Sequence, residues 1–202
     1  MYYFTQLCKM LHTKIYEILN QFSGNYNNEI YGRELIGKVK MSQKGIALAL
    51  EELEKVFILK SRRQGSLKYY RLNLANSEIK DMLAIVELMR KGKFLARHRN
   101  LAHLFKKDER IAGIFGSYAK GTQKDSSDID MFIIGEKKKE DYDALGGKMG
   151  LDINIKYFSN LEWAKLAKEK NNLCQEIVKN HILIFGTERF IEIIWGKYYG
   201  FN

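Results

Sequence analysis

The fold is decided by residues 111–134, with the sequence IAGIFGSYAKGTQKDSSDIDMFII. Residues 111–115 are apolar and predict a buried strand. Gly116 and Ser117 then end that strand in a tight polar connection. Residues 128–134 begin by alternating carboxylates with apolar residues and become wholly apolar, which predicts a second strand.

The second predicted strand carries two carboxylates on one face. Side chains two positions apart in a strand point the same way, so Asp128 and Asp130 project together, with Ile129 on the other face. Two rises of a strand place the two carboxylates about 6–7 Å apart, where they repel each other. A divalent cation would remove that repulsion, so the pair is a candidate metal site.

Composition indicates a soluble globular protein. The chain has 202 residues, of which 46% are hydrophobic and 29% charged, enough for one large or two small domains. No apolar run approaches the roughly 20 residues that cross a bilayer, and Lys9 interrupts the apolar N-terminus. Cys8 and Cys174 lack metal-ligand spacing, which favours free thiols in a reducing compartment. We therefore expect a cytoplasmic protein with no membrane partner.

The net charge of +10 is unevenly distributed along the chain. Residues 1–110 contain 21 Lys and Arg against 11 Asp and Glu, whereas residues 111–202 contain 13 of each. The excess positive charge therefore lies before the central motif. This asymmetry suggests a half that faces a polyanion, joined to a neutral half that binds ligand or carries out chemistry.

The first part of the chain has the pattern of three helices followed by a hairpin. Apolar spacing predicts a helix over residues 7–22 and a short second helix over about residues 31–39. Ser42 is a suitable N-cap for a third helix. Residues 57–72 then form two strand-like runs, with Gly65 at the bend between them.

This order resembles the winged helix-turn-helix family of small bacterial and archaeal regulators, on the residues GRELIGKVKMSQKGIALALEELEKVFIL. The resemblance covers residues 1–75 and implies that the third helix enters the major groove while the hairpin reaches phosphates. DNA binding would then fall to Gln43 and Lys44 of the helix and to Arg62 and Arg63 of the hairpin. Acidic residues in the rear of that helix depart from the pattern, and such domains also serve protein binding, so a homodimer is left open.

Residues 76–94 are predicted to form a linker helix, and residues 95–202 a second domain. After the central motif, the patterns predict strands over residues 151–158 and 182–185, and helices over residues 161–170, 173–179 and 188–194. The whole chain is therefore expected to be α+β, with a winged helix-turn-helix followed by an α/β domain that contains a mixed sheet of about four strands.

The Gly-Ser turn followed by Asp-x-Asp on the next strand resembles the nucleotidyltransferase superfamily that includes DNA polymerase β, in particular its minimal members. The resemblance covers roughly residues 95–202. Members of this family use a third carboxylate on a following strand, between apolar residues, and Asp152 fits that setting. The resemblance implies transfer of a nucleoside monophosphate from a nucleoside triphosphate, with ATP the expected donor.

Nucleotidyl transfer requires cations that neutralise the triphosphate and align the attacking oxygen. Asp128 and Asp130 would bridge two Mg²⁺ ions, and Asp152 would hold the second ion and help to remove the acceptor proton. Gly116 lets the backbone approach a phosphate closely, and the amide and hydroxyl of Ser117 can donate to it. The family often has a basic residue at the position of Lys120, which makes it a candidate phosphate neighbour.

Several alternatives remain at this stage. Asp125, Asp141 and Asp143 compete with Asp152 for the third acidic role. The acceptor is open among small-molecule hydroxyls, a protein side chain and a nucleic acid end. A different class of function is a transcription regulator whose second domain only binds or senses a nucleotide. A phosphate-binding P-loop is excluded, because Thr122 stands where its lysine is required.

Overall fold

The computed structural model describes residues 13–124 and 126–201. The chain divides into two compact units, Met1–Val86 and Glu87–Asn202. The division falls inside helix α4 (Ile79–Arg97), which contains most of the predicted linker and extends beyond it as one helix. Among the described residues, no helix combines the length and the apolar character that crossing a membrane requires.

The first unit begins, in its described part, with a helix. Helix α2 (Thr13–Leu19) passes into a 3-10 turn, η1 (Asn20–Phe22). These elements lie within the helix predicted over residues 7–22, while residues 7–12 fall outside the described part of the chain. The apolar stripe expected for this helix is buried, as shown by Ile15, Ile18, Leu19 and Phe22.

The predicted second helix is wrong. Strand β1 (Ile30–Tyr31) and the 3-10 turn η2 (Gly32–Leu35) occupy most of that segment. The backbone of β1 pairs with a distant strand, with Tyr31 opposite Tyr69, and this pairing outweighs the local helical preference. Gly37 then adopts a φ of 82°, which is incompatible with continuing a helix.

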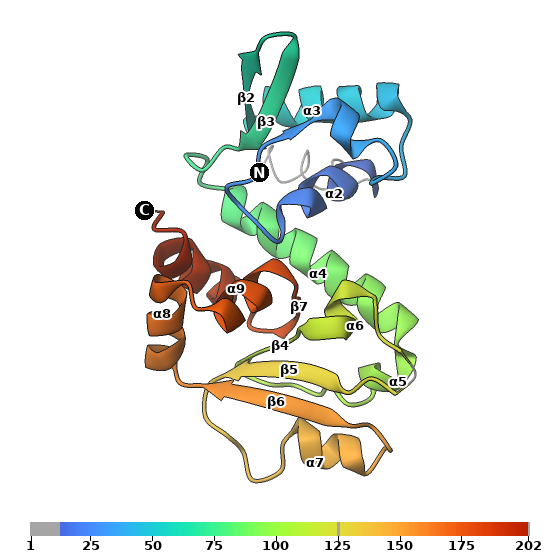
Figure 1. Ribbon diagram of the computed structural model, residues 1–202, viewed down its shortest axis with the longest axis vertical. Helices are drawn as coiled ribbons and strands as arrows, with labels where there is room; N and C mark the ends of the chain where they lie inside the picture. Colours follow the sequence, from blue (N-terminus) through green and yellow to red (C-terminus); the bar gives the residue numbers. More distant parts are fainter. Residues whose placement is uncertain (1–12, 125, 202) are drawn as a thin grey trace. The chain divides into compact units, whose positions relative to one another are not determined.

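The third helix and the hairpin form as predicted. Helix α3 (Gln43–Lys55) begins at Ser42, whose hydroxyl accepts a hydrogen bond from the Gly45 amide at 3.2 Å. Strands β2 (Leu59–Gln64) and β3 (Leu67–Leu72) form the hairpin, and Gly65 at its bend has a φ of 58°. The three strands make an antiparallel sheet in the order β1-β3-β2, and α3 lies beside the hairpin (Figure 1).

The second unit is built on a four-stranded mixed sheet, as predicted, and its strand order is β6-β5-β4-β7. Strands β5 and β6 are parallel, whereas β4 is antiparallel to both β5 and β7. The strands are β4 (Ile111–Ile114), β5 (Ile129–Ile134), β6 (Ile153–Phe158) and β7 (Ile182–Phe185). The helices are α5 (Arg99–Ala102), α6 (Gly116–Lys120), α7 (Tyr142–Gly147), α8 (Asn160–Glu169), α9 (Asn172–Lys179) and α10 (Thr187–Ile193), followed by the π-helical turn η3 (Ile194–Tyr198) (Figure 1).

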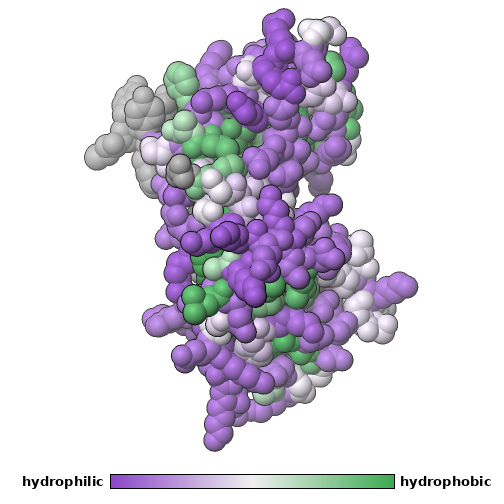
Figure 2. Space-filling model, turned by 60° about the vertical axis from the view of Figure 1, so that its left-hand side comes forward, coloured by the Kyte–Doolittle hydropathy of each residue, from purple (hydrophilic) through white to green (hydrophobic). Residues whose placement is uncertain are grey.

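Alternating residues of β5 pack into two different cores. Ile129, Met131 and Ile133 join a buried cluster that includes Tyr142 of α7. Phe132 faces the other way and stacks on Trp163 of α8, with ring centroids 6.0 Å apart. With these apolar side chains buried, the face seen in Figure 2 is mostly hydrophilic, with smaller separate hydrophobic areas. The alternation that buries both cores also sets the direction in which Asp130 points.

Helix α4 is bonded to strand β7, which lies at the edge of the sheet. The Arg90 guanidinium donates to the carbonyl of His181 at 2.7 Å, and Lys91 Nζ donates to that of Ile184 at 2.6 Å. Ile184 stands at a bulge between β4 and β7 and has no register partner there. Arg90 also contacts the buried carboxylate of Glu87, one turn earlier in α4, at 2.8 Å. The same guanidinium therefore bonds both to its own helix and to the carbonyl of His181, just before β7.

A buried group of charges precedes β4. Arg110 donates to Asp108 at 2.7 Å and to Asp141 at 2.6 Å, and these side chains are only 9%, 3% and 2% exposed. Burial opposes ionisation of Asp108, but hydrogen bonds from Arg110 outweigh it and hold the pKa of Asp108 well below its usual range. The pKa of Asp141 is lowered by the same balance of causes. We call Arg110, Asp108 and Asp141 the paired cluster.

Candidate active site

The predicted turn between β4 and β5 is held by contacts that require glycine. Gly116 has a φ of 66°, which side-chain-bearing residues rarely adopt. A Cβ atom at this position would overlap the Oδ2 atom of Asp130. The preceding Phe115 amide donates to the backbone carbonyl of Asp130 at 2.9 Å. The glycine of the Gly-Ser turn therefore lies directly against one aspartate of the Asp-x-Asp pair.

Asp128 and Asp130 lie where the turn enters β5. Asp128 is exposed, Asp130 is half-buried, and Ile129 between them is buried, as the predicted alternation requires. Burial raises the pKa of Asp130, and the negative charges of Asp128 and Glu176 raise it further. Among residues 13–124 and 126–201, neither aspartate makes an ion pair, although Lys156 and Lys120 act electrostatically on Asp130. We call Asp128 and Asp130 the unpaired aspartates.

Asp152 lies on the neighbouring chain segment at the same end of the sheet. Strands β5 and β6 are parallel with Ile129 opposite Ile153, and the Ile129 amide donates to the Asp152 carbonyl at 2.8 Å. The exposed Asp152 side chain precedes β6. Within residues 13–124 and 126–201, no group of three or more acidic, histidine or cysteine side chains is close enough together to hold a metal. The third acidic role of Asp152 therefore stays a prediction.

The structure separates Asp152 from one of its competitors. Asp141 is engaged with Arg110 at the other end of β4, so its carboxylate already has a cationic partner. Asp143 is exposed in α7 and accepts a local hydrogen bond from the Ala144 amide at 2.9 Å. Asp125 lies outside the described residues.

The unpaired aspartates suit a hard divalent cation. Mg²⁺ binds through one or two carboxylates and keeps its other positions for water and phosphate oxygens. Asp128, just before β5, and Asp130, within it, provide these ligand types. Burial is the main cause that raises the pKa of Asp130, and a bound cation would offset that loss of solvation. The donor set therefore fits the predicted metal, which Asp128 and Asp130 would hold.

Lys120, predicted to contact phosphate, is bound to a side chain that the sequence did not suggest. Its Nζ atom lies 2.7 Å from Oε1 of Glu176, which belongs to α9. Both side chains are about 40% exposed, so the ion pair is accessible to solvent. The sequence could not identify Glu176, because it lies among other polar residues of α9 and no spacing in the sequence connects it with Asp130. Only the packing of α9 near α6 reveals it.

The remaining predicted phosphate ligand, Ser117, is half-buried in α6, directly after Gly116. Lys156 is another residue that sequence reasoning missed. It stands on β6 opposite Phe132, and its positive charge acts to lower the pKa of Asp130. The cations of Lys120 and Lys156 thus both act on Asp130.

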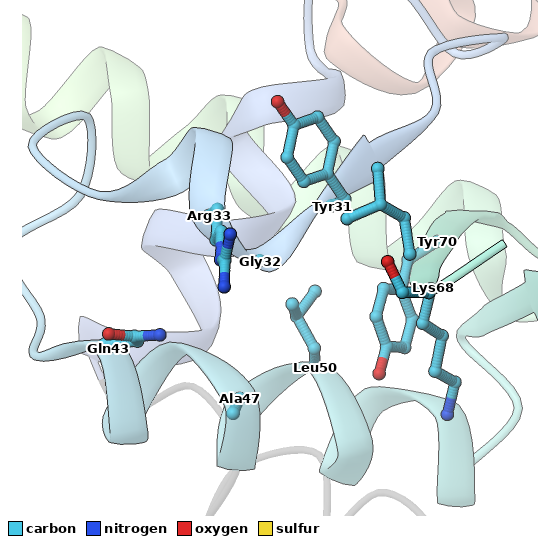
Figure 3. Close-up of a pocket in the computed structure, with 10 residues that line it drawn as sticks. Tyr31, Gly32, Arg33, Gln43, Ala47, Leu50, Lys68 and Tyr70 are labelled. Carbon is cyan, nitrogen blue, oxygen red and sulfur yellow. The ribbon is translucent and has the colours of Figure 1, made fainter. Parts of the chain in front are cut away.

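In the first unit, Gln43 and Lys44 are exposed at the start of α3. Gln43 also lines a hollow of about 330 Å³ between η2, α3 and the hairpin. Figure 3 shows Arg33 and Gln43 near one end of this hollow, and Lys68 and Tyr70 near the other. Lys68 Nζ is bound to Glu54 at 2.6 Å, which ties the hairpin to the rear of α3.

The two hairpin arginines differ in their contacts. Arg62 forms an ion pair with Glu29, and its Nε donates to Oε1 of that residue at 2.9 Å. Its guanidinium also lies over the Tyr69 ring, 5.0 Å from the centroid. Arg63 is exposed and makes no hydrogen bond or ion pair with any residue that the structure describes. The sequence alone presented the two arginines as equivalent.

The excess positive charge does not coincide with the first unit. Residues 1–86 contain 13 Lys and Arg against 8 Asp and Glu, a net of +5. Residues 87–110, in the second unit, contain 8 against 3, also a net of +5. Part of the second group serves the fold, since Arg90, Lys91 and Arg110 make the internal contacts described above.

Comparisons with known proteins agree with the site. Residues 99–190 match the family model described as polymerase beta, nucleotidyltransferase. A Methanocaldococcus jannaschii protein with the provisional name protein adenylyltransferase is 37% identical over 76 residues, which are 37% of this chain and 54% of that protein. The chain therefore spans about half the length of this curated relative. No solved structure shows significant similarity to the chain.

These matches support the predicted similarity of the second half of the chain to nucleotidyltransferases. The matched residues 99–190 include the Gly-Ser turn, the unpaired aspartates, Asp152 and Glu176.

Proposed function

We propose that the protein is a Mg²⁺-dependent enzyme that transfers a nucleoside monophosphate from a nucleoside triphosphate, with ATP the expected donor, to a hydroxyl group. The observation that carries this proposal is the contact of Gly116 with Asp130 beside Asp128. The turn that leads into Ser117 thus adjoins two carboxylates that make no ion pair with any residue that the structure describes. The name of the M. jannaschii relative favours a protein side chain as the acceptor.

Each residue of the site has a role in this reaction. Asp128 and Asp130 would hold Mg²⁺, which supplies positive charge to the triphosphate and orients the reacting oxygens. Ser117 donates a hydrogen bond to a phosphate oxygen, and Gly116 leaves room for the phosphate to approach. Asp152 accepts the proton of the acceptor hydroxyl. The acceptor oxygen bonds to the α-phosphorus as the bond from that phosphorus to the leaving pyrophosphate breaks.

We also propose that the first unit is a winged helix-turn-helix that binds DNA. Exposure of Gln43 and Lys44 at the start of α3, and of Arg63 on the hairpin, supports this assignment. The helix would enter the major groove, and Arg63 would contact phosphate. The pairing of Arg62 with Glu29 makes Arg62 the lesser contributor.

The test of the catalytic proposal uses ATP labelled at the α-phosphate, with Mg²⁺ and an extract that contains candidate acceptors. We expect transfer of label by the wild type and its loss in Asp130→Asn and Asp152→Asn. Asp143→Asn is the matched control, because Asp143 is an exposed aspartate whose described hydrogen bond is local to α7. Tight ATP binding without transfer to any acceptor would favour a nucleotide sensor instead. Loss of transfer in Asp143→Asn but not in Asp152→Asn would reassign the third acidic role.

A further inference from the structure

The ion pair between Lys120 and Glu176 joins two elements beside the unpaired aspartates. Lys120 ends α6, the short helix that begins at Gly116, and Glu176 lies in the middle of α9. Their charged atoms are 2.7 Å apart. Lys120 therefore already has an anionic partner before any phosphate arrives.

From this geometry we infer that Glu176 is a positioning residue of the nucleotide site, which holds Lys120 until the triphosphate of the donor displaces it. The inference rests on the proposed function and concerns how the donor enters. Lys120 exchanges one anionic partner for another, and no covalent bond changes. Glu176 thereby opposes donor binding, because its pair with Lys120 must open first.

The surroundings make this exchange feasible. The side chains are 39% and 40% exposed, and an ion pair so open to solvent is weak. A triphosphate with its Mg²⁺ presents more negative charge to Lys120 than one carboxylate does, and it makes charge-assisted hydrogen bonds. Both partners also act on Asp130, since Glu176 raises its pKa and Lys120 lowers it. The exchange therefore takes place within electrostatic reach of the proposed metal ligands.

The inference predicts an increase in affinity, which general damage to the site would not produce. In Glu176→Gln, Lys120 is free before the donor arrives, and one negative charge near the triphosphate is removed. Opening an exposed ion pair corresponds to roughly a two- to fivefold change in equilibrium. We therefore expect Glu176→Gln to bind the donor roughly two- to fivefold more tightly than the wild type.

The experiment measures the Kd of the full chain for α,β-methylene-ATP with Mg²⁺ by calorimetry, because this analogue cannot transfer its nucleotide. Lys120→Met should bind it more weakly, and Glu176→Gln should lose most of its effect in the Lys120→Met background. Glu169→Gln, an exposed glutamate at the end of α8, is the matched control and should leave Kd unchanged. Circular dichroism verifies that each variant is folded.

Two results would overturn the inference while the proposed function stands. One is weaker binding by Glu176→Gln, and the other is an effect of Glu176→Gln that persists in full without Lys120. If the wild type itself binds no analogue, both the inference and the proposed donor are wrong. The two failures are therefore distinguishable in the same titrations.

Discussion

Charged groups lie at both ends of strand β4, and the pKa values of their carboxylates are shifted in opposite directions. Before the strand, the paired cluster places two buried carboxylates on one guanidinium, and their pKa values are lowered. After the strand, the unpaired aspartates adjoin Gly116, and the pKa of Asp130 is raised. Both ends lose solvation, but only at the first do hydrogen bonds from a cation outweigh that loss. The first end therefore ties charges together within the fold, whereas the second holds carboxylates that have no hydrogen-bonded cation among the described residues.

The largest expected effect is the loss of activity in Asp130→Asn. Removal of a metal ligand should lower label transfer on the order of a thousandfold. Stability should stay the same or rise, because a raised pKa means that the folded state disfavours the charged form of Asp130. Transfer of label and the melting temperature check the two parts. A lowered melting temperature would contradict the view that this end is unpaired.

The next effect is the loss of stability in Arg110→Met. This change removes the guanidinium that the two buried carboxylates share and leaves only Lys138, 3.3 Å from Asp108, as a cationic partner. Breaking a buried ion pair in this way typically costs about 3–5 kcal/mol. Both tryptophans of the chain, Trp163 and Trp195, lie in the second unit, so denaturant unfolding followed by their fluorescence reports on that unit.

Arg99→Met is the control for this measurement, because Arg99 is an exposed arginine of the same unit. It should change the unfolding free energy by less than about 0.5 kcal/mol. Equal effects of the two changes would mean that the paired cluster contributes nothing special to stability.

A smaller effect is expected from pH on the paired cluster. The lowered pKa values of Asp108 and Asp141 give a stabilisation that is fully present above about pH 4 and is lost as the pH falls through the folded-state values. Melting of the second unit at pH 7 and about pH 3 should therefore show a decline in the wild type. The decline should be smaller in Arg110→Met, where protonation relieves unpaired carboxylates. An equal decline in melting temperature in the wild type and in Arg110→Met would show that Arg110 is not the cause of the pH dependence.

The smallest expected effect is on DNA binding by the hairpin. Here Arg62 forms an ion pair with Glu29, whereas Arg63 makes none with the described residues. Arg63→Ala should weaken DNA binding and reduce the slope of log affinity against log salt by about 1. Arg62→Ala should do less, because Glu29 already neutralises that guanidinium. Fluorescence anisotropy with a labelled duplex over a range of salt concentrations measures both. Equal slopes for the two variants would indicate that the pair with Glu29 opens on binding.

Local patterns predicted the elements that local forces determine. The strand over residues 182–185 matches β7, and Ser42 caps α3, because apolar runs and caps act over a few residues. The helix predicted over residues 31–39 was wrong because β1, at the start of this segment, pairs with β3, far along the chain. The unpaired aspartates were predicted from the alternation in β5, which the structure retains.

The partners of the charged residues could not be predicted in this way. Glu176 and Lys120 meet only because α9 packs near α6. Arg62 meets Glu29 only because β1, which follows Glu29, pairs with β3 of the hairpin. Asp141 competed with Asp152 in the sequence until its contact with Arg110 was known. Sequence spacing identifies which residues can carry chemistry, but the tertiary fold decides which of them remain available for it.

The bonds from α4 to β7 have a practical consequence for shortening the chain. A fragment cut at the predicted boundary of the second domain begins at residue 95. It lacks Arg90 and Lys91, so the carbonyls of His181 and Ile184 lose these hydrogen bonds. Unprotected backbone at a sheet edge is a template for pairing with another molecule. We expect a fragment that starts at residue 95 to aggregate, while one that starts at residue 79 stays dispersed, and light scattering of the two would show the difference. We therefore expect α4 to protect the edge strand β7 from pairing with a second molecule.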